Sequence, residues 1–154
     1  MIKQTCCFTG HRDIPQSEYE YIESRLYEEA EKLIKSGVMY FGSGGARGFD
    51  LLSAQVIIAL KKKYPDIRLI LIIPCPEQTK YWRLQDQIKY EQVKQSADKI
   101  RILSDKYYEG CMLARNRYIV DNSLYVICYK RKNTGGTAYT VDYAKRKCKV
   151  IVEI

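Results

Sequence analysis

The sequence predicts an α/β protein of the Rossmann-like class, with a mostly parallel sheet of about six strands and helices on both faces. Short apolar runs alternate along the chain with longer segments of helical period, which is typical of parallel strands joined by right-handed crossover helices. The apolar runs are continuous, which indicates strands buried on both faces. A length of 154 residues suits one domain, which we expect to cover residues 1–154.

Six apolar runs are predicted to be strands. The first run ends at Gly10, which favours a turn, and the third begins shortly after Pro65, which breaks the preceding helix. In chain order, the predicted strands cover residues 5–9, 38–41, 68–73, 99–103, 124–129 and 150–154.

Five segments with apolar residues at helical spacing are predicted to be helices. In the first, Ser17 is expected to cap the N-terminus, Glu20 to complete a capping box, and Gly37 to end the helix. The predicted helices cover residues 17–35, 49–63, 82–95, 112–122 and 137–147.

Ligands of such sheets bind beyond the carboxyl ends of the strands, where the next helices begin. Two loops predicted at that edge are rich in glycine: residues 42–48 and residues 133–137. Glycine lets backbone N–H groups approach an anion, and a helix N-terminus adds about half a positive charge. Neither loop matches the P-loop pattern, and no G-x-G-x-x-G follows the first strand. We expect both turns to hold phosphate, with a simple tight connection as the alternative.

Polar residues near these loops add candidate contacts. Arg115 and Arg117 suit bidentate binding of phosphate and Asn116 suits a base or ribose edge, with surface salt bridges as the alternative. Asp50 begins a helix, where it either complements the helix dipole or accepts a ribose hydroxyl. Trp82 either stacks on a base or anchors its helix in the core.

His11 is the only histidine, which excludes metal sites built on two histidines, and no metal is expected. A hydrogen-bonded structural imidazole or a ligand donor is favoured over a catalytic base. The residues expected to bind the ligand are Thr9, Gly10, His11, Arg12, Gly42, Ser43, Gly44, Gly45, Ala46, Gly48, Asp50, Pro74, Gln78, Trp82, Arg115, Asn116, Arg117, Gly135, Gly136 and Thr137.

The composition limits the partners. A net charge of +8 favours anionic partners such as nucleotides or nucleic acid, although a solvated basic face is the simpler explanation. No apolar run approaches the length of a membrane span, so no membrane partner is expected. None of the six cysteines has C-x2-C zinc spacing, and we expect buried thiols in a cytoplasmic protein, with Cys75 and Cys111 as loop candidates for reactive thiols.

Six ordered motifs together resemble the YpsA-like branch of the SLOG superfamily, which is related to the Smf/DprA and LOG proteins. They cover residues 8–12, 44–50, 73–78, 110–112, 115–121 and 135–137, and so extend over nearly the whole chain. The resemblance implies a Rossmann-like fold that binds a nucleotide or nucleotide-derived ligand, such as a signal related to ADP-ribose or NAD. It favours a sensor or a sequestering protein, and homodimers are common among such proteins.

LOG proteins cleave the N-glycosidic bond of nucleoside monophosphates with an Arg and the Glu of a P-G-G-x-G-T-x-x-E block. Here Ala138 and Tyr139 occupy the Gly-Thr positions of that block and Asp142 occupies the Glu position. Binding without turnover is therefore favoured. The alternative is a hydrolase with Asp142 or Glu77 as its catalytic carboxylate, and a second alternative is DprA-like nucleic-acid binding.

Overall fold

The computed structural model describes all residues 1–154 and contains one six-stranded sheet. All neighbouring strands are parallel, and their order is β4-β3-β2-β1-β5-β6. The strands are β1 (Thr5–Gly10), β2 (Tyr40–Ser43), β3 (Arg68–Ile73), β4 (Lys99–Ile102), β5 (Tyr125–Tyr129) and β6 (Val150–Glu153). The predicted class, a Rossmann-like parallel sheet of six strands, is confirmed.

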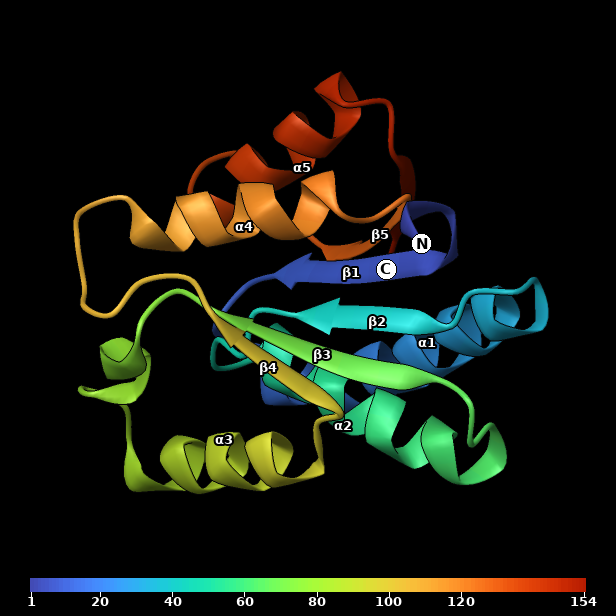
Figure 1. Cartoon of the computed structure of the whole chain (residues 1–154), viewed down its shortest axis with the longest axis horizontal. Helices are drawn as coiled ribbons and strands as arrows, with labels where there is room; N and C mark the ends of the chain where they lie inside the picture. The colour runs from blue at the N-terminus through green and yellow to red at the C-terminus, as the bar shows by residue number, and fades with distance from the viewer.

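Helices cover both faces of the sheet. They are α1 (Gln16–Lys35), α2 (Phe49–Lys63), α3 (Leu84–Ser96), α4 (Cys111–Asp121) and α5 (Gly136–Arg146), with short 3-10 turns η1 (Ile2–Gln4) and η2 (Pro76–Thr79). Figure 1 shows α1, α2 and α3 on one face and α4 and α5 on the other. The larger apolar core lies under α1, α2 and α3, and a smaller one lies under α4 and α5. None of these helices combines the length and apolar composition needed to cross a bilayer.

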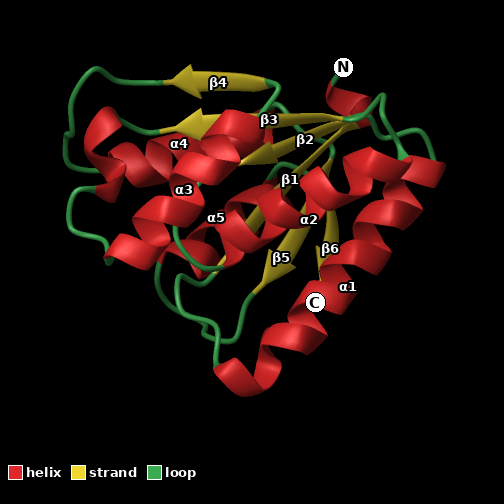
Figure 2. Cartoon of the chain, turned by 90° about the horizontal axis from the view of Figure 1, so that it is seen from below, coloured by secondary structure: helices red, strands yellow, loops and turns green.

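The strand order creates one switch point, between β1 and β5. From β1 the chain adds β2, β3 and β4 toward one edge, and α4 then carries it back to β5 on the other side of β1. The connections on the two sides of this point diverge, which leaves a crevice at the carboxyl ends of these two strands. Figure 2 shows the accompanying twist, because β4 and β6 run in clearly different directions.

Most predicted boundaries differ from the observed ones by one or two residues, and at the starts of α1 and β2 the local reason is clear. Helix α1 begins at Gln16 after the extended residue Pro15, and no side chain, including that of Ser17, caps it. Strand β2 begins at Tyr40 because the Val38 N–H instead bonds the Leu33 carbonyl at 3.0 Å. That bond closes the C-terminus of α1 through Gly37, whose φ of +108° suits glycine.

Strand β4 differs from the expectation that every strand is buried on both faces. All of its residues are exposed, because it is an edge strand that pairs only with β3. Its sequence, Lys-Ile-Arg-Ile, alternates charge with apolar character as an edge strand does.

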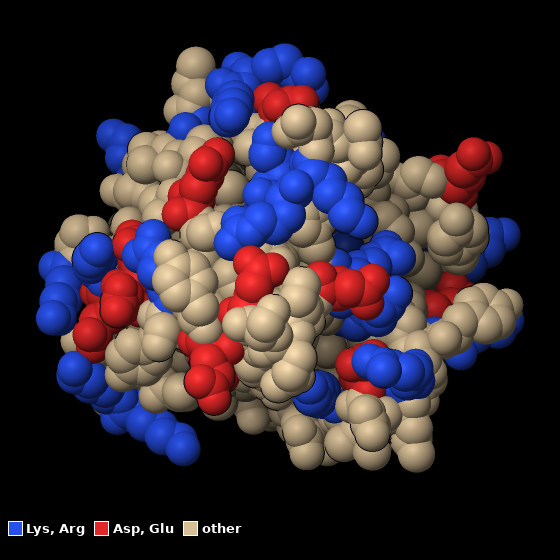
Figure 3. Space-filling model, turned by 180° about the vertical axis from the view of Figure 1, so that it is seen from behind, with Lys and Arg blue, Asp and Glu red and all other residues tan.

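On the face shown in Figure 3, Lys and Arg side chains are interspersed with Asp and Glu, as on an ordinary solvated surface.

Candidate functional site

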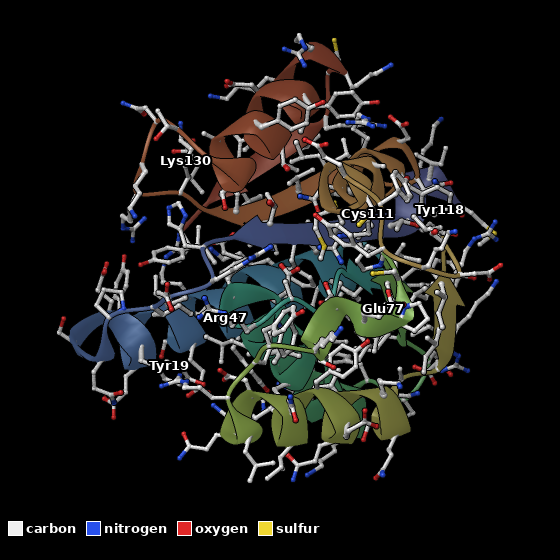
Figure 4. The ribbon with its side chains drawn as sticks, turned by 90° about the vertical axis from the view of Figure 1, so that its left-hand side faces the viewer. Tyr19, Arg47, Glu77, Cys111, Tyr118 and Lys130 are labelled. Carbon is white, nitrogen blue, oxygen red and sulfur yellow. The ribbon has the colours of Figure 1, made fainter.

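A cleft of about 700 Å³ lies at the carboxyl edge of the sheet, at the switch point between β1 and β5. Its walls are the loop after β1, the first turn of α4, the end of β5 and the loop into α5. Figure 4 looks onto this edge of the molecule. The volume of the cleft is within the range of small-molecule sites in proteins.

The cleft brings together many of the residues expected from the sequence, from four different segments. They are Thr9, Gly10, His11, Arg12, Ala46, Asp50, Arg115, Asn116, Gly135, Gly136 and Thr137. It also includes residues that the sequence analysis missed, among them Met112, Tyr129, Arg131 and Lys132. Three of them, Tyr129, Arg131 and Lys132, lie at or directly after the end of β5. Their place at the carboxyl end of a predicted strand could have identified them from the sequence.

Other expected residues lie outside the cleft. These are Gly42, Ser43, Gly44, Gly45, Gly48, Pro74, Gln78, Trp82 and Arg117. Both carboxylates proposed for catalysis also lie outside it. Asp142 is exposed further along α5, and Glu77 lies on η2 and accepts a hydrogen bond from the Tyr107 N–H at 2.9 Å. Neither is placed to act on a ligand in the cleft.

The N-terminus of α5 offers backbone donors to the cleft. The N–H groups of Gly136, Thr137 and Ala138 make no hydrogen bond within the protein, and the first bonded amide of the helix is that of Tyr139. Gly135 precedes the helix with φ of +95°, and no heavy atom lies near the place where its Cβ would stand. Unpaired N–H groups at a helix N-terminus are an anion-binding arrangement.

The glycine-rich turn 42–48, by contrast, uses the backbone donors of Gly45 and Ala46 inside the protein. The Gly45 N–H bonds Ser43 Oγ at 3.2 Å, and the Ala46 N–H bonds Asp50 Oδ2 at 3.4 Å. At the start of α2, the Phe49 N–H bonds the His11 carbonyl at 3.1 Å. The amides of Gly45 and Ala46 are therefore not free to bind phosphate, and phosphate binding by this turn stays a prediction. Its glycines serve close packing between neighbouring loops.

Arg115 explains why this turn needs glycine. Its side chain is buried, with 2% exposed, and its Nη1 donates to the carbonyls of Gly44 and Ile72 and to Gln78 Oε1. A Cβ on Gly44 would stand 2.7 Å from the guanidinium carbon. Nη2 makes no hydrogen bond within the protein, while Arg115 lines the cleft. Arg115 thus ties the ends of β2 and β3 together and leaves one nitrogen for a ligand.

Three other expected contacts have partners within the protein. Arg117 points to α5 and donates to the Tyr139 hydroxyl at 3.0 Å. Asn116 donates to Thr140 Oγ1 at 3.1 Å and accepts from Arg115 Nε at 2.8 Å. His11 accepts the Arg131 N–H at 2.7 Å on Nε2, and burial with the nearby Lys132 and Arg131 lowers its pKa. His11 thus makes the hydrogen bond expected of a structural imidazole, one of its two favoured roles, and it also lines the cleft.

The two loop cysteines considered for reactivity are buried. Cys75 and Cys111 are at most 1% exposed. Burial raises the pKa of the Cys75 thiol to about 11, so this residue stays a thiol at neutral pH. The expectation of buried thiols holds at these two positions, and their burial argues against the reactive alternative.

Asp50 is the buried carboxylate of the cleft. It is 7% exposed and lines the cleft, and its only hydrogen bond as an acceptor on the side chain comes from the Ala46 N–H. Burial raises the pKa of Asp50 to about 6, although the Arg115 guanidinium and the Ala46 N–H both favour the charged form. The site therefore holds a carboxyl group with an unpaired oxygen beside a partly free guanidinium.

This raised pKa predicts a pH dependence of stability. Because the folded state holds the Asp50 proton more tightly than the unfolded state, the stabilisation is present below about pH 4 and is lost as pH rises through about 6. We expect the unfolding free energy of the wild type to fall by about 2–3 kcal/mol relative to that of Asp50→Asn as the pH rises over that window. Urea denaturation of both proteins at several pH values measures it. Parallel pH profiles for the two proteins would contradict the assignment.

Comparisons with known proteins agree with this fold. The sequence model of the YpsA family, described as the YspA SLOG family, matches residues 7–150. The UPF0398 protein BH1768 of Halalkalibacterium halodurans is 30% identical over 130 residues, which cover 82% of this chain and 69% of that protein. A UPF0398 protein of Macrococcus caseolyticus is 32% identical over 110 residues, covering 70% of this chain and 60% of its own.

Two solved structures share the fold. DNA processing protein A from Helicobacter pylori, studied for its single-stranded DNA binding mode, superposes with a TM-score of 0.67 at 21% identity over 97% of this chain and 64% of that chain. The homologous protein from Streptococcus pneumoniae superposes with a TM-score of 0.67 at 15% identity, over 97% of this chain and 49% of its own. This chain therefore spans about half to two thirds of the length of these proteins.

Proposed function

Because the chain belongs to the YpsA family of SLOG proteins, we propose that it binds a nucleotide or nucleotide-derived ligand in the cleft between β1 and β5. We favour a ligand related to ADP-ribose or NAD, held without turnover by a sensor or sequestering protein. The observation that carries this proposal is the row of three unpaired N–H groups at the start of α5, two of which belong to cleft-lining residues, Gly136 and Thr137.

Two positive groups stand near these amides. Arg12 lines the cleft and makes no hydrogen bond or ion pair within the protein, and the Nη2 atom of Arg115 is likewise unpaired. The amides of Met112 and Leu113, in the first turn of α4, also lack acceptors. Two helix N-termini and two guanidinium groups therefore converge on one cleft, which supports binding of a phosphate group.

Asp50 favours a different part of the ligand from the phosphate that the amides and guanidinium groups would bind. A buried carboxylate accepts hydrogen bonds but repels phosphate, so it favours the part of a ligand that carries hydroxyl groups. Amides for phosphate and a carboxylate for hydroxyls, in one cleft, together match a phosphorylated ribose. We therefore expect a ligand that carries a ribose beyond this phosphate, such as ADP-ribose, to bind more tightly than one that ends in the phosphate, such as ADP.

A ligand screen tests the proposed function. AMP, NAD and ADP-ribose are added to the protein in a thermal-shift experiment, because a ligand that binds the native state raises its melting temperature. Isothermal titration calorimetry then measures the affinity of each ligand that shifts it. No shift and no heat with any of these compounds would overturn the proposal.

Gly136 provides a sharper test of the amide site. Gly136→Pro removes one N–H at the first position of α5, where proline is compatible with a helix. The matched control Gly136→Ala keeps the N–H, and its Cβ would make only an ordinary contact with Leu113 at 3.9 Å. We expect the proline variant to bind about tenfold or more weakly, the scale of one charge-assisted hydrogen bond, and the alanine variant to bind like wild type. Equal affinities would remove α5 from the site.

A second candidate function is hydrolysis of a nucleotide N-glycosidic bond. The supporting observation is that Asp50, with its pKa raised to about 6, is a buried carboxyl group of the cleft. A raised pKa in a cleft is a property of acid–base groups in enzymes. Release of free base from nucleoside monophosphates by the wild type, and its loss in Asp50→Asn, would establish the hydrolase. Absence of base release leaves binding alone.

A further inference from the structure

A second cavity of about 840 Å³ adjoins the cleft. The two cavities share Arg12 and Met112, so they meet at the loop after β1 and the first turn of α4. Its remaining walls come from Arg47 after β2, from the segment around η2, and from the loop that precedes α4. Arg47 and Glu77, which line it, both lie on the edge of the molecule that faces the viewer in Figure 4.

Aromatic side chains line this second cavity and are unusually exposed. Tyr81 is 89% exposed and Tyr107 is 60% exposed, and Trp82 is partly buried with its ring edge-on to Tyr90 at 5.5 Å. The loop that carries Tyr107 is held to η2 by the bond from its N–H to Glu77. Large aromatic surfaces left open around a cavity suit stacking of a planar ring.

The charge around these rings is mostly positive. Arg12, Arg47, Lys80 and Lys106 line the cavity, against a single carboxylate, Glu77. Arg47 is paired with Asp13 at 2.8 Å, whereas Arg12 has no partner. The one unpaired guanidinium therefore stands where the two cavities meet, between the amides of α5 and the aromatic rings.

We propose that the second cavity holds a planar ring of the same ligand whose phosphate binds at α5, which makes the ligand a nucleoside diphosphate derivative. One phosphate binds the α5 amides and the other binds Arg12 at the junction. The base stacks among Tyr81, Trp82 and Tyr107, and any group attached to the first phosphate lies in the cleft near Asp50. This inference rests on the proposed function, because it assigns the far end of the same ligand.

The fluorescence of Trp82 can test this proposal. Trp82 is the only tryptophan and lines the second cavity, so a ring that enters this cavity changes its fluorescence. We expect ADP and ADP-ribose to change the emission of Trp82, and inorganic pyrophosphate, which lacks a ring, to leave it unchanged. Calorimetry on the same samples reports binding to the cleft independently of Trp82.

Tyr107 and its neighbour Tyr108 form a matched pair of variants. Tyr107→Ala is expected to weaken ADP binding about tenfold, the scale of one lost stacking contact, without changing the affinity for pyrophosphate. Tyr108 is 49% exposed but does not line the cavity, so Tyr108→Ala is expected to bind ADP like wild type.

The outcomes separate the two proposals. Calorimetric binding of ADP with unchanged Trp82 emission and unaffected affinity in Tyr107→Ala overturns the second cavity as a subsite and leaves the proposed function standing. No heat with any nucleotide overturns both. Quenching of Trp82 by a single-stranded oligonucleotide, but not by ADP or ADP-ribose, assigns the surface to nucleic acid and overturns the inference.

Discussion

Arg115→Met is expected to lower the free energy of unfolding by about 3–5 kcal/mol, the range found when one member of a buried charged network is removed. The variant leaves the Ile72 carbonyl and Gln78 Oε1 without their donor, and it leaves Asp50 buried without the guanidinium that favours its charge. Methionine fills part of the volume, so the loss reflects mainly the polar network. Urea denaturation at neutral pH measures it.

Two further variants test this explanation. Arg117→Ala removes a neighbouring arginine of the same helix that has a single hydrogen bond to Tyr139, and we expect a loss below about 1 kcal/mol. Adding Asp50→Asn to Arg115→Met is expected to restore about 1 kcal/mol, because the carboxylate left without its cation is then neutral. If Arg115→Met cost no more than Arg117→Ala, Arg115 would not be the residue that ties these loops together.

Gly48→Ala is expected to be about as damaging, with a loss of about 3–5 kcal/mol. Gly48 has φ of +80° and precedes α2, and a methyl group there would overlap the backbone carbonyl of Arg12. The expected loss combines backbone strain of about 1–3 kcal/mol with overpacking of about 1–3 kcal/mol. Relief requires the loop after β1 to move, and that loop carries Arg12 into both cavities.

Gly37→Ala is the matched control for this prediction. Gly37 also has a positive φ, +108°, but no atom lies within 4 Å of its Cβ position. We expect it to lose only the backbone strain, about 1–2 kcal/mol. Thermal or urea denaturation of both variants gives the difference, which is the contribution of the close approach between the two loops. Equal losses would show that backbone strain alone explains the cost at Gly48.

The sequence was most informative where local signals and burial agree. The predicted bounds of α2 and β3 are those observed, since the helix starts after Gly48 and the strand is an apolar run that follows Pro65 and begins directly after Arg68. The exposure of edge strand β4 was harder to predict from the sequence, because it depends on which strands lie beside it in the sheet. The start of β2 was also wrong, since the Val38 N–H is used by the end of α1.

The candidate site was predictable as a set of loops but not as a set of contacts. Parallel strands bring their carboxyl ends to one edge, so the loops after β1, β2 and β5 were expected to meet there. Which side chain packs against the glycine turn 42–48 was not predictable, because Arg115 and Gly44, whose carbonyl it binds, are 71 residues apart in the chain. Asp142 was likewise a wrong candidate, since the turn of α5 places it on the exposed side.

The sequence by itself determined the parallel α/β architecture, the family and the edge of the sheet at which a ligand would bind. Only the tertiary structure decided which polar groups remain available there: the amides of α5, Arg12, one nitrogen of Arg115 and one oxygen of Asp50. The physical reason is that apolar periodicity depends on residues close together in the chain. Hydrogen-bond partners and close packing, by contrast, come largely from segments that are distant in the chain.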